Sequence, residues 1–315
     1  MTTPSSSEII TRMRDAIAEV IVGYEEAVDF LLTALLSNGH ILIEDVPGVG
    51  KTMLARTLAV ISGLDFKRIQ FTPDLLPSDV TGINMYDPHK GEFNFQPGPV
   101  FTNILLADEI NRATPRTQSA LLECMQERQV TLGGVTRPVP NPFVTIATQN
   151  PVEMSGTFPL PGAQLDRFLM RVFLGYPTES NEMEVVRRYR RPQNPEERVS
   201  AVVSPEDIVQ LSQAAAEVHL RDDIRDYVVT CVRKTREAPG IELGASPRSA
   251  VMLANASRSL AFLNGRDYVI PDDVQRLVPP VLGHRLVTSE ESWLRGREGE
   301  AILKDILETV PVPGE

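Results

Sequence analysis

The chain has 315 residues, of which 42% are hydrophobic and 23% are charged, a composition typical of soluble globular proteins with space for two domains. Its net charge of −11 argues against a nucleic-acid backbone as the main partner, because such binding depends on clustered Lys and Arg. No apolar run approaches the roughly 20 residues that span a bilayer, and the N-terminal MTTPSSSEII does not resemble a secretion signal, so we expect a cytoplasmic protein without a membrane span.

The first part of the chain alternates helices with short apolar runs. Ser5 and Glu8 have the spacing of a capping box, which predicts a helix over residues 6–20. Further helices are predicted at 25–37, 52–62 and 115–128, and strands at 41–44, 66–71, 104–107, 143–148 and 170–174. Strands that alternate with helices predict a parallel sheet covered on both faces, and therefore an α/β fold.

The second part of the chain, from Thr178 onward, is a series of capped helices. Ser204, Ser246 and Pro271 each begin a helical segment, and the strand signals fade. We therefore expect an α/β domain over 1–176 and an all-helical domain over 177–315, with a hinge at Tyr176-Pro177.

Residues 41–52, ILIEDVPGVGKT, combine an apolar strand with a glycine-broken turn and Lys-Thr. Gly48 and Gly50 let the backbone N–H groups approach phosphate oxygens, Lys51 neutralises the outer phosphates, and the Thr52 hydroxyl is placed to hold Mg²⁺. The motif G-x-x-x-x-G-K-[ST] is altered at its first position, which is occupied by Asp45. We interpret the segment as a phosphate-binding loop with a modified entry.

A carboxylate pair follows the apolar strand in ILLADEI, residues 104–110. Adjacent strand residues point in opposite directions, so Asp108 can face the Mg²⁺ while Glu109 faces an attacking water as its general base. An acidic pair at a strand end can also cap a turn, but its position after the phosphate loop favours the catalytic interpretation.

Two further sets of polar residues are candidates for the same site. Asn150, in IATQNP, is our choice for an amide that bonds the γ-phosphate or orients the water, with Gln149 as the alternative and turn initiation as the structural interpretation. Arg167 in AQLDRFLMR and Arg248 in GASPRSA are candidates to compensate phosphate charge; surface salt bridges are the usual fate of such residues.

The cysteines and histidines show no spacing typical of a metal site. Cys124 and Cys231 are too few for a disulfide framework, and we expect each to be a reduced, buried thiol. The four histidines, at positions 40, 89, 219 and 284, receive no catalytic role.

The ordered segments GVGKT, LLADEINRA, ATQNP, LDRF and SPRSA resemble those of AAA+ ATPases, and DEINRA together with LPSDVTG resembles the MoxR family. The resemblance covers residues 21–286 and implies a P-loop NTPase core followed by a helical lid. It implies that Asn150 is sensor 1, Arg248 is sensor 2 and Arg167 is an arginine finger, with Arg171 as the alternative finger. It also implies ATP and Mg²⁺ as cofactors, with the nucleotide held by Gly23, Tyr24, Pro47, Gly48, Val49, Gly50, Lys51, Thr52, Met53 and Asp108, and the metal by Thr52 and Asp108.

Two insertions resemble those of this subgroup. Residues 74–100 interrupt the strand–helix alternation and resemble the helix-2 insertion, and residues 129–139 alternate around Gly133-Gly134, which predicts a β-hairpin. In the family both lie toward the pore of a ring, where Tyr86, Phe93 and Phe95 are candidates to contact a client or, alternatively, to anchor the loop to the core.

The resemblance implies an ATP-hydrolysing remodeller of protein clients that works as a homo-oligomeric ring, most simply a hexamer, in complex maturation or metal-cofactor insertion with a von Willebrand factor A domain partner. A nucleic-acid-dependent motor is the first alternative, and the acidic charge weighs against it. The second is a nucleotide-gated scaffold with little turnover, and the intact Asp108-Glu109 pair weighs against it.

Overall fold

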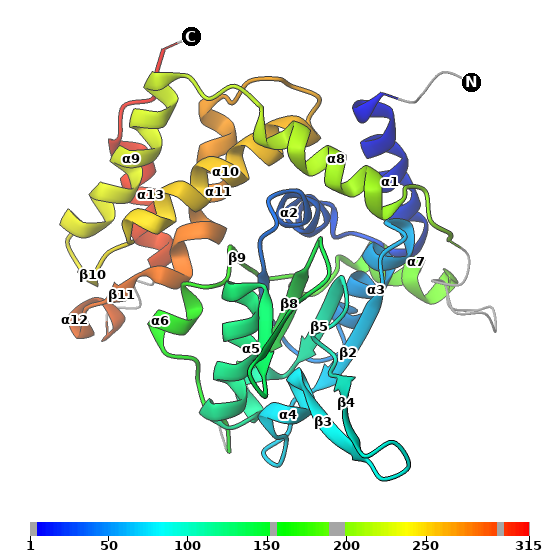
Figure 1. Cartoon of the computed structure of the whole chain (residues 1–315). Helices are drawn as coiled ribbons and strands as arrows, with labels where there is room; N and C mark the ends of the chain where they lie inside the picture. The colour runs from blue at the N-terminus through cyan, green and yellow to red at the C-terminus, as the bar shows by residue number, and fades with distance from the viewer. Residues whose placement is uncertain (1–4, 152–155, 189–198, 295–298, 315) are drawn as a thin grey trace.

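A five-stranded parallel sheet forms the centre of the structure, a computed structural model that describes residues 5–151, 156–188, 199–294 and 299–314 (Figure 1). The strand order is β2-β5-β8-β1-β9. The strands are β1 (Ile41–Glu44), β2 (Phe66–Gln70), β5 (Ile104–Asp108), β8 (Val144–Gln149) and β9 (Met170–Val172). The predicted α/β fold with a parallel sheet is confirmed, and the near-continuous apolar strands suit a sheet buried on both faces.

Helices cover the two faces of this sheet. On one face Ile41 and Ile43 of β1 pack with α1 (Ser6–Val20), α2 (Glu25–Leu36) and α3 (Lys51–Ile61). On the other face Leu42 packs in the cluster that contains α4 (Pro77–Thr81) and α5 (Pro115–Glu127). The alternation within β1 follows from the two-residue period of a strand.

The C-terminal part is helical, as predicted. It contains α8 (Pro205–Ala216), α9 (Asp222–Glu237), α10 (Pro247–Leu263), α11 (Pro271–Leu282), α12 (Glu290–Leu294) and α13 (Gly299–Thr309). The prediction of an all-helical region missed one small ribbon, formed by β10 (Ile241–Leu243) and β11 (Val287–Thr288). In the part of the chain that the structure describes, no helix is long and apolar enough to cross a membrane.

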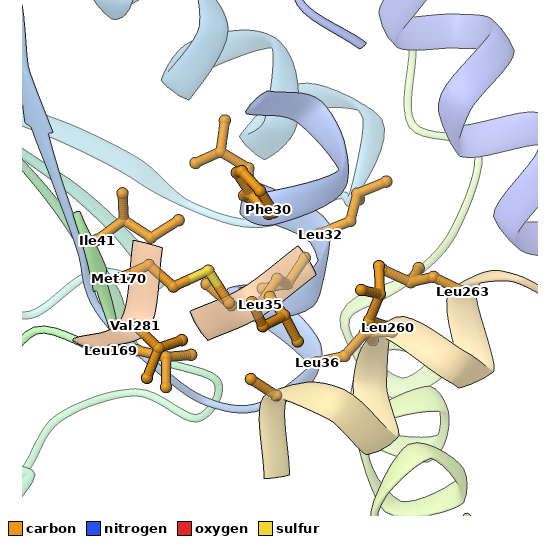
Figure 2. Packing of buried hydrophobic residues seen from close by; sticks show 14 of the residues in the cluster. Phe30, Leu32, Leu35, Leu36, Ile41, Leu169, Met170, Leu260, Leu263 and Val281 are labelled. Carbon is orange, nitrogen blue, oxygen red and sulfur yellow. The ribbon is translucent and has the colours of Figure 1, made fainter. Parts of the chain in front are cut away.

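Helix α2 is the shared wall between the sheet and the C-terminal helices. Its side chain Leu36 lies beside Leu260 of α10, and Leu35 lies beside Val281 of α11 and Met170 of β9 (Figure 2). Phe30 also meets α11, because the Arg276 guanidinium lies 5.6 Å from its ring centroid. Leu35 is fully buried, and burying a leucine side chain contributes about 1.5–3 kcal/mol. This packing places the C-terminal helices beside the N-terminal end of β1.

Helix α7 (Glu179–Arg188) lies apart from α8–α13 and against α1 (Figure 1). Arg188 Nη1 donates to the carbonyl oxygens of Ala18 at 2.7 Å and Glu19 at 2.9 Å. Helix α7 therefore belongs to the wall beside the phosphate loop.

Both predicted insertions contain antiparallel hairpins. β3 (Gly82–Asp87) pairs with β4 (Glu92–Pro97), and β6 (Gln129–Leu132) pairs with β7 (Val135–Pro138). The predicted 129–139 hairpin is confirmed. The two hairpins are joined by Arg137, whose guanidinium lies 4.1 Å from the ring centroid of Phe95, while that ring meets Phe101 edge-on at 5.3 Å. Phe95 therefore anchors the insertion.

Both cysteines are buried. Burial raises the pKa of the Cys124 thiol to about 12 and that of Cys231 to about 11. Both thiols are therefore protonated and unreactive at neutral pH, as expected from the sequence.

One buried histidine joins three elements next to the sheet. His40 Nδ1 accepts the Thr145 N–H at 2.9 Å, and Nε2 lies 3.1 Å from the Met125 carbonyl oxygen. This arrangement requires the neutral ring with its proton on Nε2. Burial, assisted by the Arg128 charge, lowers the pKa of His40 to about 3.

We expect the His40→Gln variant to show a flatter dependence of stability on pH than the wild type. Below pH 6.5 the histidine of the unfolded chain is protonated, whereas His40 of the folded chain stays neutral down to about pH 3. The free energy of unfolding is therefore unaffected by His40 above pH 6.5 and decreases as pH falls from 6.5 toward 3. At pH 5 the loss is about 2 kcal/mol. Urea unfolding at pH 7 and pH 5 measures the change in the free energy of unfolding. An equal change for the wild type and His40→Gln would contradict the assignment.

Candidate nucleotide-hydrolysing site

The turn between β1 and α3 forms a cradle for an anion. Gly48 and Gly50 both have φ of 89°, and a Cβ at either would meet nothing within 4 Å. Glycine is therefore needed for the left-handed backbone and not for close packing. Lys51 and Thr52 occupy the first turn of α3, where free N–H groups and the helix dipole favour a phosphate.

Lys51 is positioned by the same loop. Its Nζ donates to the Asp45 carbonyl oxygen at 2.6 Å, which leaves two of its three N–H groups for phosphate oxygens. Burial lowers the pKa of Lys51, and the carboxylates of Asp45, Asp108 and Glu109 oppose that shift.

A cavity of about 610 Å³ adjoins the cradle. The segment before α2, the phosphate loop and α7 contribute its walls, which are mostly apolar. Tyr24 lines it and donates its hydroxyl to the Gly175 carbonyl oxygen at 3.1 Å. Gly23, one residue earlier, has φ of 79°, which favours glycine, and a Cβ there would also lie 2.0 Å from Asn181 Nδ2. Pro47, Val49 and Met53 line the same cavity, so the residues present fit a nucleoside base beside its phosphates.

Asp108 ends β5 next to the cradle. The Thr148 hydroxyl donates to its Oδ1 at 2.6 Å, and Arg68 Nη2 donates to its Oδ2 at 2.6 Å. Thr148 also accepts the Glu109 N–H at 2.8 Å, so one hydroxyl orients both acidic residues. With Thr52, Asp108 supplies the hydroxyl and carboxylate oxygens that suit Mg²⁺, which is usually held by few protein ligands together with substrate phosphates.

Glu109 has a strained backbone. Its φ of 56° and ψ of 50° are left-handed values that a non-glycine residue adopts at a cost, and such strain is concentrated at functional sites. Its Oε2 accepts from Gln70 Nε2 at 2.8 Å and from Arg112 Nη1 at 3.0 Å. The carboxylate is thus held in a fixed position at the C-terminal edge of the sheet.

The amide candidates lie at the C-terminal end of β8, which runs between the strands that carry the phosphate loop and Asp108. Gln149 is the last residue of β8 and pairs in register with Glu44. Asn150 follows it and is 6% exposed. Both therefore lie at the edge of the sheet that the phosphate loop and the carboxylates occupy.

The two arginine candidates lie at the other end of the sheet. Arg167 and Arg248 line a cavity of about 240 Å³ with His40, which precedes β1. A strand rises about 3.3 Å per residue, so β1 separates this cavity from the phosphate loop by roughly 13 Å. Sequence reasoning did not indicate this separation.

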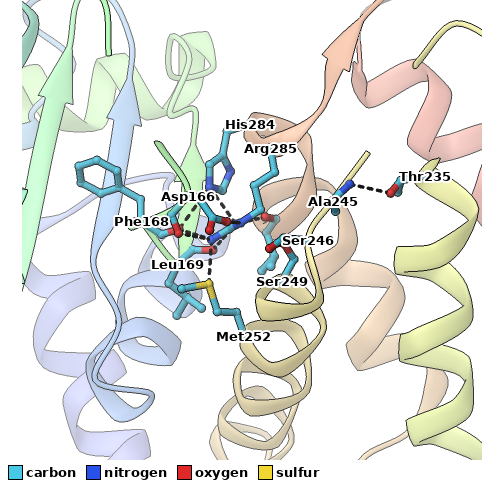
Figure 3. Close-up of polar contacts among 11 residues, drawn as sticks. Asp166, Phe168, Leu169, Thr235, Ala245, Ser246, Ser249, Met252, His284 and Arg285 are labelled. Carbon is cyan, nitrogen blue, oxygen red and sulfur yellow. Dashed lines mark hydrogen bonds and ion pairs between the residues drawn. The ribbon is translucent and has the colours of Figure 1, made fainter. Parts of the chain in front are cut away.

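The segment that carries Arg167 is tied to the C-terminal helices by Arg285 (Figure 3). Arg285 Nε donates to Asp166 Oδ1 at 2.7 Å, and its Nη2 donates to the Phe168 carbonyl oxygen at 2.5 Å. Both neighbours of Arg167 are therefore fixed. Arg171, the alternative finger, is engaged in its own chain, with Nη1 3.3 Å from Glu44 Oε2.

Four residues around the carboxylates were missed by sequence reasoning, namely Arg68, Gln70, Arg112 and Thr148. Thr148 and Gln70 lie at the C-terminal ends of β8 and β2, and Arg68 lies earlier on β2. Polar side chains at the ends of parallel strands meet at one edge of the sheet, and this rule could have indicated Thr148 and Gln70.

The fold and the arrangement of this site are those of the AAA class of ATPases. Residues 40–170 match the family model "ATPase family associated with various cellular activities (AAA)", and residues 233–306 match the "AAA lid domain". The chain is 44% identical over 306 residues to Chaperone MoxR1 of Mycobacterium tuberculosis, covering 94% of this chain and 80% of that protein. It is 49% identical over 297 residues to the protein YeaC of Bacillus subtilis, covering 94% and 92%.

A crystal structure from Cytophaga hutchinsonii superposes with a TM-score of 0.92 at 42% identity, covering 98% of this chain and 96% of that one. Together with the MoxR relatives, this agreement extends over both parts of the fold. The chain belongs to the MoxR family of AAA+ ATPases.

Proposed function

We propose that this protein hydrolyses ATP at sites shared between neighbouring copies of itself and uses the energy to remodel protein clients. The observation that carries the proposal is the division of the site. The phosphate loop and the acidic pair lie at one end of the sheet, and Arg167 and Arg248 lie at the other. In a head-to-tail ring, the arginine end of one subunit meets the phosphate end of the next.

In the proposed reaction Lys51 and the α3 N-terminus hold the triphosphate. Thr52 and Asp108 would hold Mg²⁺, which would supply positive charge against the phosphates. Glu109 accepts a proton from the attacking water. Asn150, or alternatively Gln149, orients that water or the γ-phosphate. Arg167 from the neighbour stabilises the charge that develops on the transferred phosphoryl group, and Arg248 assists it. Hydrolysis then depends on assembly.

The two hairpins are placed to transmit movement from the site. The β3–β4 hairpin leads through Phe101 into β5, which ends at Asp108, and the β6–β7 hairpin leads into β8, which contains Thr148. The Arg137–Phe95 contact joins the hairpins at 4.1 Å. A shift of Asp108 against Thr148 would therefore move both hairpins together.

The tip of the β3–β4 hairpin is the proposed contact surface for a client. Tyr86 is 52% exposed and Phe93 is 71% exposed, and their ring centroids lie 5.3 Å apart. Exposed aromatic pairs of this kind are enriched in contact surfaces. We further propose a cytoplasmic hexamer, with a von Willebrand factor A domain protein as partner, in complex maturation or metal insertion, which rests on the MoxR family membership.

We expect the Tyr86→Ala, Phe93→Ala double variant to lose ATP-dependent client capture and to keep basal ATP hydrolysis, because the pair lies outside the nucleotide site. Capture is measured with the pair changed in a Glu109→Gln background, by quantifying co-purified protein with and without ATP. Tyr268→Ala is the matched control, because Tyr268 is an exposed aromatic residue in the connection between α10 and α11. Unchanged capture by the double variant would remove the hairpin tip from the proposal.

A further inference from the structure

Asp45 stands at the position where the common phosphate-loop motif has glycine, and its carboxylate faces the backbone N–H groups of Leu174 and Gly175. The side chain is almost buried, with the residue 8% exposed. Its Oδ2 accepts the N–H groups of Leu174 and Gly175, both at 2.6 Å, and its Oδ1 accepts the Val46 N–H at 2.8 Å. Three backbone N–H groups therefore stabilise the negative charge of a carboxylate that lies close to a phosphate-binding loop.

The segment that Asp45 holds is the connection between β9 and α7. Leu174, Tyr176 and Pro177 in this connection line the 610 Å³ cavity that adjoins the phosphate cradle. Gly175 in the same connection accepts the Tyr24 hydroxyl at 3.1 Å. The β9–α7 connection is thus hydrogen-bonded both to Asp45 of the phosphate loop and to Tyr24, which lies on the side proposed for the base.

The main chain of Asp45 belongs to the phosphate loop at the same time. Its carbonyl oxygen accepts Lys51 Nζ at 2.6 Å, and its N–H donates to the Gln149 carbonyl oxygen at 3.2 Å. A displacement of the β9–α7 connection would therefore also displace Lys51, the residue proposed to bind the phosphates. Glycine at position 45 could not make this link, because it has no side-chain acceptor.

We propose that Asp45 is a positioning residue that couples the base side of the cavity to the phosphate loop, and so makes the site selective for a complete nucleoside triphosphate over a bare triphosphate. With the connection fastened, contacts to the base and contacts to the phosphates strengthen one another. This inference rests on the proposed nucleotide site and goes beyond it by assigning the residue that links its two halves.

The test compares the affinities of Mg-ATP and Mg-tripolyphosphate for the full chain by titration calorimetry. In Asp45→Asn one carboxylate oxygen becomes an NH₂ that cannot accept from the backbone N–H groups it faces, and the remaining acceptor is no longer charged, so ATP affinity falls about tenfold. Tripolyphosphate affinity stays unchanged or rises, because a negative charge near the phosphates has been removed. Charge removal alone would tighten both ligands, and a damaged phosphate loop would weaken both.

Asp207→Asn is the matched control, because its carboxylate also accepts a backbone N–H, from Ser204 at 2.8 Å, at the start of α8; it should change neither affinity. Tyr24→Phe provides a second variant should Asp45→Asn fail to fold, and it should also weaken ATP selectively. A constant ratio of the two affinities across the variants would overturn the coupling. Failure of the wild type to bind either ligand would instead overturn the nucleotide site itself.

Discussion

Glu109→Gln is expected to lower ATP turnover by about 10²–10⁴-fold while ATP affinity is retained. The glutamine amide cannot take the proton from the attacking water. Its oxygen can still accept from Gln70 and Arg112, which hold the carboxylate at 2.8 and 3.0 Å in the wild type, so the local geometry should survive. Steady-state hydrolysis and equilibrium nucleotide binding measure the two effects separately.

We also expect the Glu109→Gln protein to remain assembled with ATP bound, because the ligand that joins the subunits is not consumed. Glu123→Gln, an exposed residue on α5, should behave as the wild type. Turnover of ATP by Glu109→Gln at the wild-type rate would show that another group accepts the proton.

Arg167→Ala is expected to lower turnover by about 10³–10⁵-fold, the contribution of an arginine donated to phosphoryl transfer. The Arg167→Ala subunit should bind ATP with wild-type affinity, because Arg167 lies at the opposite end of the sheet from the phosphate loop. Rapid-quench hydrolysis and calorimetry on the same protein measure both quantities.

Two companion variants make this result specific. Arg233→Ala removes an exposed arginine from α9 and should have little effect. Arg171→Ala removes the ion pair with Glu44 at 3.3 Å, and its main effect should be on thermal stability. A larger loss of turnover in Arg171→Ala than in Arg167→Ala would assign the finger to Arg171.

The parts of the site that the sequence predicts are those encoded by contiguous residues. The glycines and Lys51-Thr52 follow one strand, and Asp108-Glu109 follow another, so the strand ends and the motif chemistry are visible together. The hairpin around Gly133-Gly134 is predicted for the same reason, because its turn and its alternation are local.

Contacts between distant segments could not be predicted. The role of Asp45 depends on backbone donors 129 and 130 residues further along the chain. The Thr148 hydroxyl likewise donates to Asp108 from the neighbouring strand of the sheet. The placement of the C-terminal helices depends on α2, whose buried side chains belong to the same hydrophobic cluster as those of β1, α10 and α11. The β10–β11 ribbon has strands of three and two residues, too short for any periodicity to indicate them.

Mixing two inactive variants tests the shared site most directly. Lys51→Ala should neither bind nor hydrolyse ATP in its own cavity but still presents Arg167, and Arg167→Ala keeps its own cavity but presents no finger. If the site is completed by a neighbour, the mixture recovers ATP turnover that neither protein shows alone. If turnover in the mixture equals the sum of the two separate proteins while both are assembled together, the division of the site between subunits is wrong.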